Sequence, residues 1–254
     1  MKSLIHKNLT MILNALLPQF CQVCEKPSVS RALCDTCKLK IKFLEPPFCS
    51  ICGDTLLTLN RENCSMCGKC SKMKHYIRKS RSLALYELPI KDLILHFKFQ
   101  NKTYLVNEFL SLIEEHFCDI NFLEYDCYIA VPLHSKKWSE RKFNQALLLA
   151  ERLGQKYGKS VLKNILFKKI HTPSQVELNR KERLVNLKKV FELKNGTLLE
   201  NKKILLIDDI QTTRSTLIEC AQTLQKGNPQ FIDSFAVAKT SELSFGTKGF
   251  IKPT

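Results

Sequence analysis

From residue 78 onward, short apolar runs alternate with longer segments in which apolar residues recur at helical spacing. The apolar runs predict β-strands at Ser82–Tyr86, Cys127–Val131, Ile165–Phe167, Ile204–Ile207 and Ile232–Val237. The helical spacing predicts helices at Pro89–Phe97, Tyr104–Phe117, Ser139–Leu153 and Thr213–Gln225. Strands that alternate with helices in this way predict an α/β fold with a mostly parallel sheet and helices on its faces.

The first twenty residues carry a different pattern. One helical face collects Ile5, Leu9, Ile12, Leu13 and Leu16. This spacing predicts an amphipathic helix that docks on the rest of the protein. An export signal is the alternative, but the apolar run is short, contains a polar residue and lacks a small-residue cleavage site. No later stretch is long enough to span a membrane, so we expect a cytoplasmic protein that is not membrane-spanning.

Composition narrows the class of partner. The 254 residues include 40 Lys and Arg against 24 Asp and Glu, a net charge of +16, and 44% of them are hydrophobic. That apolar content excludes a disordered chain. The positive charge favours a polyanionic partner such as nucleic acid, a phosphorylated metabolite or an anionic surface. A generally basic surface without a specific partner is the alternative.

The cysteines are concentrated in one region, because nine of the twelve lie between Cys21 and Cys70. A CxxC turn points two thiolates at one centre, and two such turns complete a tetrahedral zinc site. Four such pairs occur: Cys21/Cys24, Cys34/Cys37, Cys49/Cys52 and Cys67/Cys70. We therefore predict about two structural Zn²⁺ ions. A disulfide framework is the alternative, which a reducing compartment disfavours.

Two questions about these sites stay open at this point. Neighbouring pairs can share a zinc, or the pairs can interleave. Cys64 also has CxxC spacing with Cys67, which leaves its role as a ligand undecided. The change in composition near Arg78 predicts two units, with the helix and double zinc ribbon in residues 1–76 and the α/β domain in residues 77–254.

A basic cluster follows the last cysteine pair. It consists of Lys69, Lys72, Lys74, Arg78 and Lys79, with His75 and Tyr76 among them. Cations next to an aromatic ring can hold phosphates and stack a base, as single-stranded nucleic acid requires. A solvated basic face has the same sequence, so DNA contact is one of two interpretations.

The most informative segment is ILLIDDIQTTRST, residues 204–216. Four apolar residues lead to Asp208 and Asp209, and carboxylates presented at a strand end need a cationic or hydroxylated partner. The Thr- and Ser-rich turn that follows opens a helix, whose N-terminus binds phosphate. Together these features predict a site for a ribose 5-phosphate. An ordinary strand followed by a capped helix is the alternative.

The same segment resembles the motif that binds phosphoribosyl pyrophosphate (PRPP) in type I phosphoribosyltransferases. Three further stretches are similar to the ComF family (competence protein F): LILHFKFQNK from Leu93, VPLHSKKWSERKFNQALLLA from Val131 and HTPSQVELNRKERLVNLKKVF from His171. The resemblance extends to about residue 240. It implies a type I phosphoribosyltransferase-like domain behind a zinc-ribbon head. The chain departs from the family where Arg214 replaces a glycine, and two other turns also lose a glycine.

The resemblance also implies roles for individual residues. Asp208 and Asp209 would hold the ribose hydroxyls, directly or through Mg²⁺, and Arg180 and Arg183 would reach the pyrophosphate from a mobile loop. Further charge on the pyrophosphate would come from Lys136, Lys137 and Arg141. The 5-phosphate loop would consist of Ile210, Gln211, Thr212, Thr213, Arg214, Ser215 and Thr216.

Two functions follow from this resemblance. The first is Mg²⁺-dependent transfer of ribose 5-phosphate from PRPP to an unknown acceptor. The second is a PRPP- or nucleotide-sensing protein that binds single-stranded DNA during uptake for natural transformation, with a helicase as partner. A third hypothesis is a zinc-ribbon regulator whose second domain is only a scaffold. Arg214 in place of glycine favours binding without turnover, or else a charged contact to the phosphate.

Overall fold

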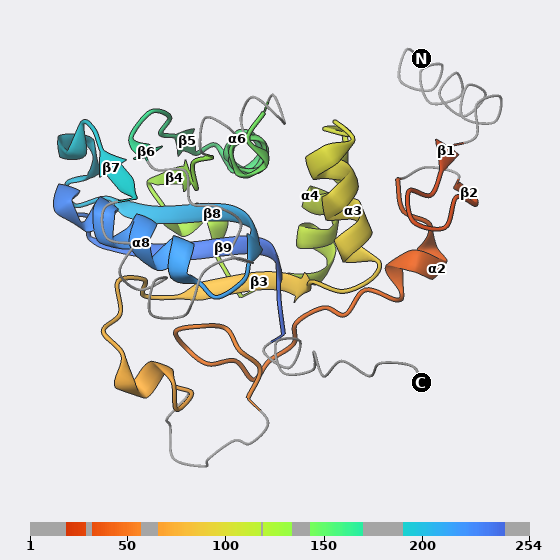
Figure 1. Cartoon of the computed structure of the whole chain (residues 1–254), viewed down its shortest axis with the longest axis horizontal. Helices are drawn as coiled ribbons and strands as arrows, with labels where there is room; N and C mark the ends of the chain where they lie inside the picture. The colour runs from red at the N-terminus through yellow and green to blue at the C-terminus, as the bar shows by residue number, and fades with distance from the viewer. Residues whose placement is uncertain are drawn as a thin grey trace, which may run out of the picture.

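A five-stranded parallel sheet forms the centre of the computed structural model, which describes residues 19–28, 32–56, 66–117, 119–133, 143–169 and 190–241. The strands run in the order β3-β9-β8-β4-β5, and every neighbouring pair is parallel. Their bounds are β3 Ser80–Leu85, β4 Cys127–Ala130, β5 Ser160–Val161, β8 Lys203–Gln211 and β9 Phe231–Lys239. The predicted α/β architecture is therefore confirmed (Figure 1).

Helices cover both faces of the sheet, as a parallel sheet requires. Leu205 and Ile207 of the central strand β8 belong to one apolar cluster, which they share with α3, α4 and α6. Ile204 and Leu206 belong to a second cluster, which they share with α8. The alternation follows from the two-residue period of a strand. The helices are α3 Ile90–Phe99, α4 Leu105–His116, α6 Gln145–Tyr157 and α8 Ser215–Leu224.

Three elements differ from the sequence-based expectation. The predicted strand at 165–167 is β6, Leu166–Lys168, and it pairs antiparallel with β7, Phe191–Leu193, outside the main sheet. The short edge strand β5 was not predicted, because two residues carry no periodic signal. β8 continues four residues beyond its predicted end at Ile207. The start of the predicted helix at Ser139 lies outside the described residues.

One side chain sets the start of α6 and joins it to the sheet. Asn144 Oδ1 accepts hydrogen bonds from the backbone N–H groups of Ala146 and Leu147, at 3.0 and 3.4 Å. This satisfies two amides that a helix start leaves without partners. The Asn144 amide also donates to the carbonyl of Val131 at 3.0 Å, just after β4. The N-terminus of α6 is thereby fixed at the carboxyl end of the sheet.

The two cysteine-rich segments pack against different parts of the α/β core (Figure 1). Cys21 and Cys37 join the apolar cluster that includes α3 and α4. The second segment lies along β3, where the Ser80 N–H donates to the Ile51 carbonyl at 2.7 Å. The boundary at residue 76 stays a prediction, and the expected docking helix in residues 1–18 lies outside the described residues. Within the described part of the chain, no helix is long and apolar enough to cross a membrane.

A buried carboxylate joins the start of the α/β segment to its last strand. Asp233 on β9 is fully buried and accepts two hydrogen bonds from Arg78, at 3.0 and 2.6 Å. It also accepts one from the Tyr125 hydroxyl at 2.9 Å. Arg78 stacks on Phe231, with the guanidinium 3.6 Å from the ring centroid.

We expect Asp233→Asn to lower the free energy of unfolding by about 2–3 kcal/mol, because it removes the buried charge that accepts hydrogen bonds from Arg78 and Tyr125. Urea denaturation measures this change. Glu124→Gln is the matched control, since Glu124 contacts the same guanidinium at 3.0 Å from an exposed position. Its loss should cost less than about 1 kcal/mol. Equal effects of the two variants would contradict the assignment of Asp233 as the structural partner.

Candidate ligand site and metal centres

The acid pair lies inside the last part of β8. Asp208 pairs with Ala236 of β9, and the strand ends only at Gln211, which pairs with Lys239. The expected loop is thus shorter than predicted and comprises residues 212–214 before α8 begins at Ser215. Because all five strands are parallel, the pair lies at the carboxyl edge of the sheet, where open α/β sheets bind ligands.

The two carboxylates have different electrostatic environments. Burial and the adjacent charge of Asp209 raise the pKa of Asp208 to about 8, although Lys98 opposes this shift. The Asp209 N–H also donates to Asp208 Oδ1 at 2.9 Å. Two adjacent half-buried acids favour a positively charged partner.

Lys98 of α3 supplies such a charge in this structure. Its Nζ lies 2.9 Å from Asp209 Oδ1, and both side chains are only 13% exposed. Lys98 belongs to the LILHFKFQNK stretch, but nothing in the sequence indicates that this lysine reaches the acid pair. Helical periodicity places a residue on a face and does not name its partner on a distant strand.

Hydroxyl groups gather where α8 begins. Thr213 Oγ1 lies 3.0 Å from Ser215 Oγ, and Thr212 and Thr213 are exposed. Arg214 is the N-cap residue, and its side chain makes no capping hydrogen bond. The exposed hydroxyls and the helix N-terminus therefore offer donors to an anion at the same edge of the sheet as the carboxylates.

The backbone of Arg214 has a conformation that suits the glycine that the family resemblance implies at this position. Its φ of 60° and ψ of −4° are left-handed, a conformation that glycine adopts without a steric penalty. The arginine side chain points toward the second cysteine cluster, where Nη2 lies 3.7 Å from Cys70 Sγ. The expected alternative, a charged contact to phosphate, would need this side chain to leave the thiol.

Two members of the expected phosphate loop have side chains that pack into the protein. Gln211 is 3% exposed, and its Oε1 accepts a hydrogen bond from the Ser80 hydroxyl at 2.7 Å. Ile210 packs against the apolar cluster of α3, α4 and α6. The remaining loop residues, Thr212, Thr213, Ser215 and Thr216, are exposed or half-buried.

Several residues expected at the pyrophosphate lie outside the described part of the chain. They are Lys136, Lys137, Arg141, Arg180 and Arg183. The described residues that border the two segments containing these side chains are Leu133 and Phe143 for the first segment and Lys169 and Val190 for the second.

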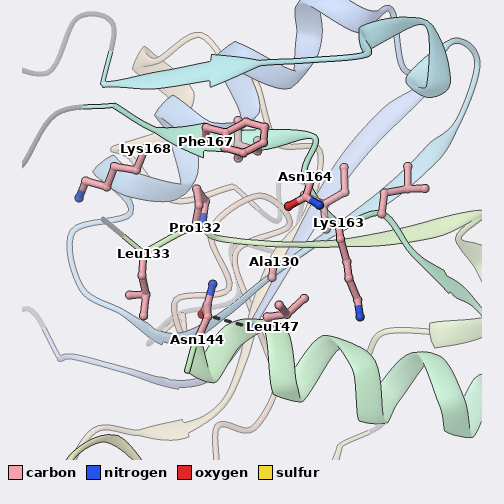
Figure 2. Close-up of a pocket in the computed structure, with 12 residues that line it drawn as sticks. Ala130, Pro132, Leu133, Asn144, Leu147, Lys163, Asn164, Phe167 and Lys168 are labelled. Atoms are coloured by element: carbon pink, nitrogen blue, oxygen red, sulfur yellow. Dashed lines mark hydrogen bonds between the residues drawn. The ribbon is translucent and has the colours of Figure 1, made fainter. Parts of the chain in front are cut away.

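A cavity of about 490 Å³ adjoins the carboxyl end of β4 (Figure 2). Pro132 and Leu133 line it after β4, Leu147 lines it from α6, and Phe167 lines it from β6. Sequence reasoning missed this cavity because its far wall comes from the loop between β5 and β6, which carries no motif. An apolar cavity beside convergent polar groups is the form that small-molecule sites usually take.

The first four cysteines form one cluster. The Sγ atoms of Cys21, Cys24, Cys34 and Cys37 all lie within 4.8 Å of one another, and the Cys24–Cys34 pair is 3.6 Å apart. Tetrahedral Zn–S bonds place sulfur atoms about 3.8 Å apart, so the cluster fits zinc. Burial acts to raise the pKa of Cys21, but backbone N–H groups of Cys34, Cys24 and Val23 outweigh it and lower the pKa to about 6. A thiolate held by amides is ready to bind metal.

The last four cysteines form a second cluster of the same kind. Cys49, Cys52, Cys67 and Cys70 also have all Sγ atoms within 4.8 Å, with 3.7 Å between Cys52 and Cys67. Burial again acts to raise the pKa of Cys49, and N–H groups led by that of Cys52 lower it to about 6. Neighbouring pairs thus share a centre and do not interleave. Cys64 lies outside the described residues.

A family model described as a double zinc ribbon domain matches residues 12–73. This match agrees with two four-cysteine centres in the described residues. Over most of its length, the chain is 32% identical over 215 residues to competence protein F of Haemophilus influenzae, an alignment that covers 82% of this chain and 90% of the relative. The chain belongs to the ComF family.

Other relatives are similar to this chain at lower identity. Competence protein ComFC of Bacillus subtilis is 27% identical, over 82% of this chain and 84% of the relative. DNA utilization protein YhgH of Escherichia coli is 24% identical, over 82% of this chain and 97% of the relative. Among solved structures, a purine phosphoribosyltransferase from Pyrococcus horikoshii aligns with a TM-score of 0.31 and 17% identity, covering 54% of this chain and 81% of that one.

We expect purified protein to contain about two Zn²⁺ per chain, because each four-thiolate centre closes around one ion. Cys24→Ser should remove one zinc and Cys67→Ser the other, as measured by elemental analysis. Cys127→Ser is the control, since this buried cysteine belongs to the sheet and not to either cluster. Wild-type protein that is folded and free of metal would refute the assignment.

Proposed function

We propose that this ComF-family protein binds PRPP at the carboxyl edge of its sheet and acts in DNA uptake for natural transformation. One observation carries the PRPP proposal. The strand that carries the acid pair and the hydroxyl-rich start of α8 are separated by only three residues, 212–214. A ribose phosphate presents vicinal hydroxyls close to an anion, so carboxylates and anion donors at this spacing complement it.

Each group has a distinct part in this proposal. Asp208 and Asp209 accept hydrogen bonds from the ribose hydroxyls. Thr212, Thr213 and the first N–H groups of α8 donate to the 5-phosphate. The acid pair also favours the positive charge that develops on a ribosyl centre during transfer, which is the property a phosphoribosyltransferase needs. The acceptor of such a transfer has no assigned site here.

Mg²⁺ is the metal expected to accompany PRPP. The fit rests on the donor set, because Asp208 and Asp209 offer the oxygen ligands that Mg²⁺ prefers. A bound cation would also oppose the burial and the Asp209 charge that raise the pKa of Asp208. The ion would shield the charge of the pyrophosphate group. In its absence, Lys98 partly neutralises the pair through Asp209.

Replacing both Asp208 and Asp209 by Asn should abolish measurable PRPP binding, since each charged hydrogen bond lost costs more than about tenfold in affinity. Calorimetry with PRPP and Mg²⁺ measures this. Asp126→Asn is the control, because Asp126 accepts from the Lys203 N–H at the opposite end of β8. The proposal would be refuted if the wild-type protein did not bind PRPP, or if the double mutant still bound it.

Lys98→Met should make PRPP binding more dependent on Mg²⁺, because it leaves the acid pair without its protein cation. We expect about a tenfold loss of PRPP affinity at low Mg²⁺ and recovery at saturating Mg²⁺. Lys91→Met, at an exposed position of the same helix, should leave both affinities unchanged. An unchanged Mg²⁺ dependence in Lys98→Met would show that the ion pair is purely structural.

Contact with single-stranded DNA is a second candidate function, and it is compatible with PRPP sensing. Relatives named for competence and DNA utilization support it. Lys72 and Lys74 are exposed, and the Lys74 ammonium lies 5.4 Å from the centroid of the Tyr76 ring. Arg78 and Lys79, which the sequence grouped with them, form ion pairs with Asp233 and Asp119. The candidate surface is therefore smaller than the sequence cluster, and a helicase partner stays a proposal drawn from the family.

Replacing Lys72 and Lys74 by Ala should flatten the salt dependence of single-stranded DNA binding by a slope of about 1.4, since each released phosphate contact contributes about 0.7. Fluorescence anisotropy across a salt series measures the slope. A matched pair, Lys91→Ala with Lys226→Ala, removes the same charge from exposed positions elsewhere. Equal slopes for the two double variants would show that Lys72 and Lys74 belong to a solvated basic face and not to a DNA-binding surface.

A further inference from the structure

The loop at the start of α8 is in direct contact with the second cysteine centre. Arg214 Nη2 lies 3.7 Å from Cys70 Sγ, although the two residues are 144 positions apart in sequence. Cys70 is fully buried, and it belongs to the cluster with Cys49, Cys52 and Cys67. A residue of the candidate phosphate loop therefore reaches a predicted zinc ligand.

Other contacts fix the second centre to the same region of the sheet. Lys239, which pairs with Gln211 at the last position of β8, forms an ion pair with Asp54. Asp54 follows Cys52 by two residues. Gly53 lies so close to the sheet that an added Cβ would meet the Ser80 carbonyl at 2.5 Å. The centre is thus held against the sheet by an ion pair and by close backbone packing, independently of Arg214.

The chemistry of the contact matches its geometry. Four thiolates around one Zn²⁺ carry a net charge of −2, and a guanidinium N–H pointing at a sulfur offsets part of that charge. Hydrogen-bond partners around metal ligands commonly change metal affinity when they are removed. The contact also explains how a side chain can occupy a left-handed position, which is sterically strained for residues with a Cβ.

We propose that Arg214 is a positioning residue that ties the phosphate loop to the second zinc centre. The zinc centre holds the loop in its left-handed turn through the arginine, where a glycine would adopt that turn unaided. Arg214 then serves neither of the roles expected from sequence, because its charge is directed at the zinc thiolates and not at the phosphate. The expected effect of Arg214 on zinc release is independent of PRPP. Only the expected effect on PRPP affinity rests on the proposed function.

Arg214→Asn and Arg214→Gly separate the side chain from the backbone. Both residues tolerate the left-handed conformation, and both lack the guanidinium. We expect zinc to leave the second centre about tenfold faster in both variants, while the first centre is unaffected. Release of zinc to a colorimetric chelator gives the rates. Cadmium substitution followed by ¹¹³Cd NMR resolves the two centres, and only one resonance should move.

Asn195→Gly is the matched control. Asn195 is exposed and also has a left-handed φ of 51°, but it belongs to neither cysteine cluster. It should change neither zinc release nor the cadmium spectrum. Unchanged release and unchanged resonances in both Arg214 variants would overturn the proposal. Equal acceleration at both centres would overturn it too, because that result indicates a general loss of stability.

PRPP affinity is measured in the same proteins. If the zinc centre positions the loop through Arg214, Arg214→Asn should bind PRPP more weakly than the wild type and also lose zinc faster. Arg214→Gly should retain more of the PRPP affinity than Arg214→Asn. Weaker PRPP binding with normal zinc release would identify Arg214 as a phosphate ligand and overturn the proposal. A wild type that does not bind PRPP would refute the proposed function alone, since the zinc measurements would still decide the role of Arg214.

Discussion

The arrangement of the molecule depends on the burial of β8 on both of its faces. Residues 204–207 are completely shielded from solvent and alternate between two apolar clusters. Burying four large aliphatic side chains contributes about 1.5–3 kcal/mol each, so this strand cannot shift its register without exposing them to water. Because the strand is fixed, Asp208 and Asp209 are fixed at its carboxyl end, and the turn to α8 begins at one defined position.

The zinc ribbons extend this scaffold where apolar burial is insufficient. The second cysteine cluster has only a small apolar neighbourhood of its own, so metal binding would supply much of its folding energy. The cluster lies against β3 and near the end of β8, so metal binding there would stabilise the protein beside the candidate site. The first cluster packs against α3 and α4 instead. Since α3 also carries Lys98 to Asp209, both ribbons adjoin elements that contact the acid pair or its loop.

The sequence predicted the elements that follow from local pattern, and it missed contacts that depend on distant partners. Strand β8, helix α8 and the grouping of cysteines follow from periodicity and CxxC spacing. The pairing of β6 with β7 was not predictable, because a three-residue apolar run does not specify its neighbour. The ion pair of Arg78 was not predictable either, since charge in sequence does not reveal that this arginine meets a buried carboxylate on β9.

Arg214 illustrates how a departure from a family pattern can be interpreted physically. In the sequence, the missing glycine indicates either lost turnover or a gained phosphate contact, because the sequence shows no partner for Arg214 outside the loop. The structure keeps the left-handed backbone and directs the guanidinium to Cys70. A substitution that removes conformational freedom can be accepted when the new side chain gains a partner that holds the same backbone shape. The change at Arg214 is therefore best understood together with the zinc centre that it contacts.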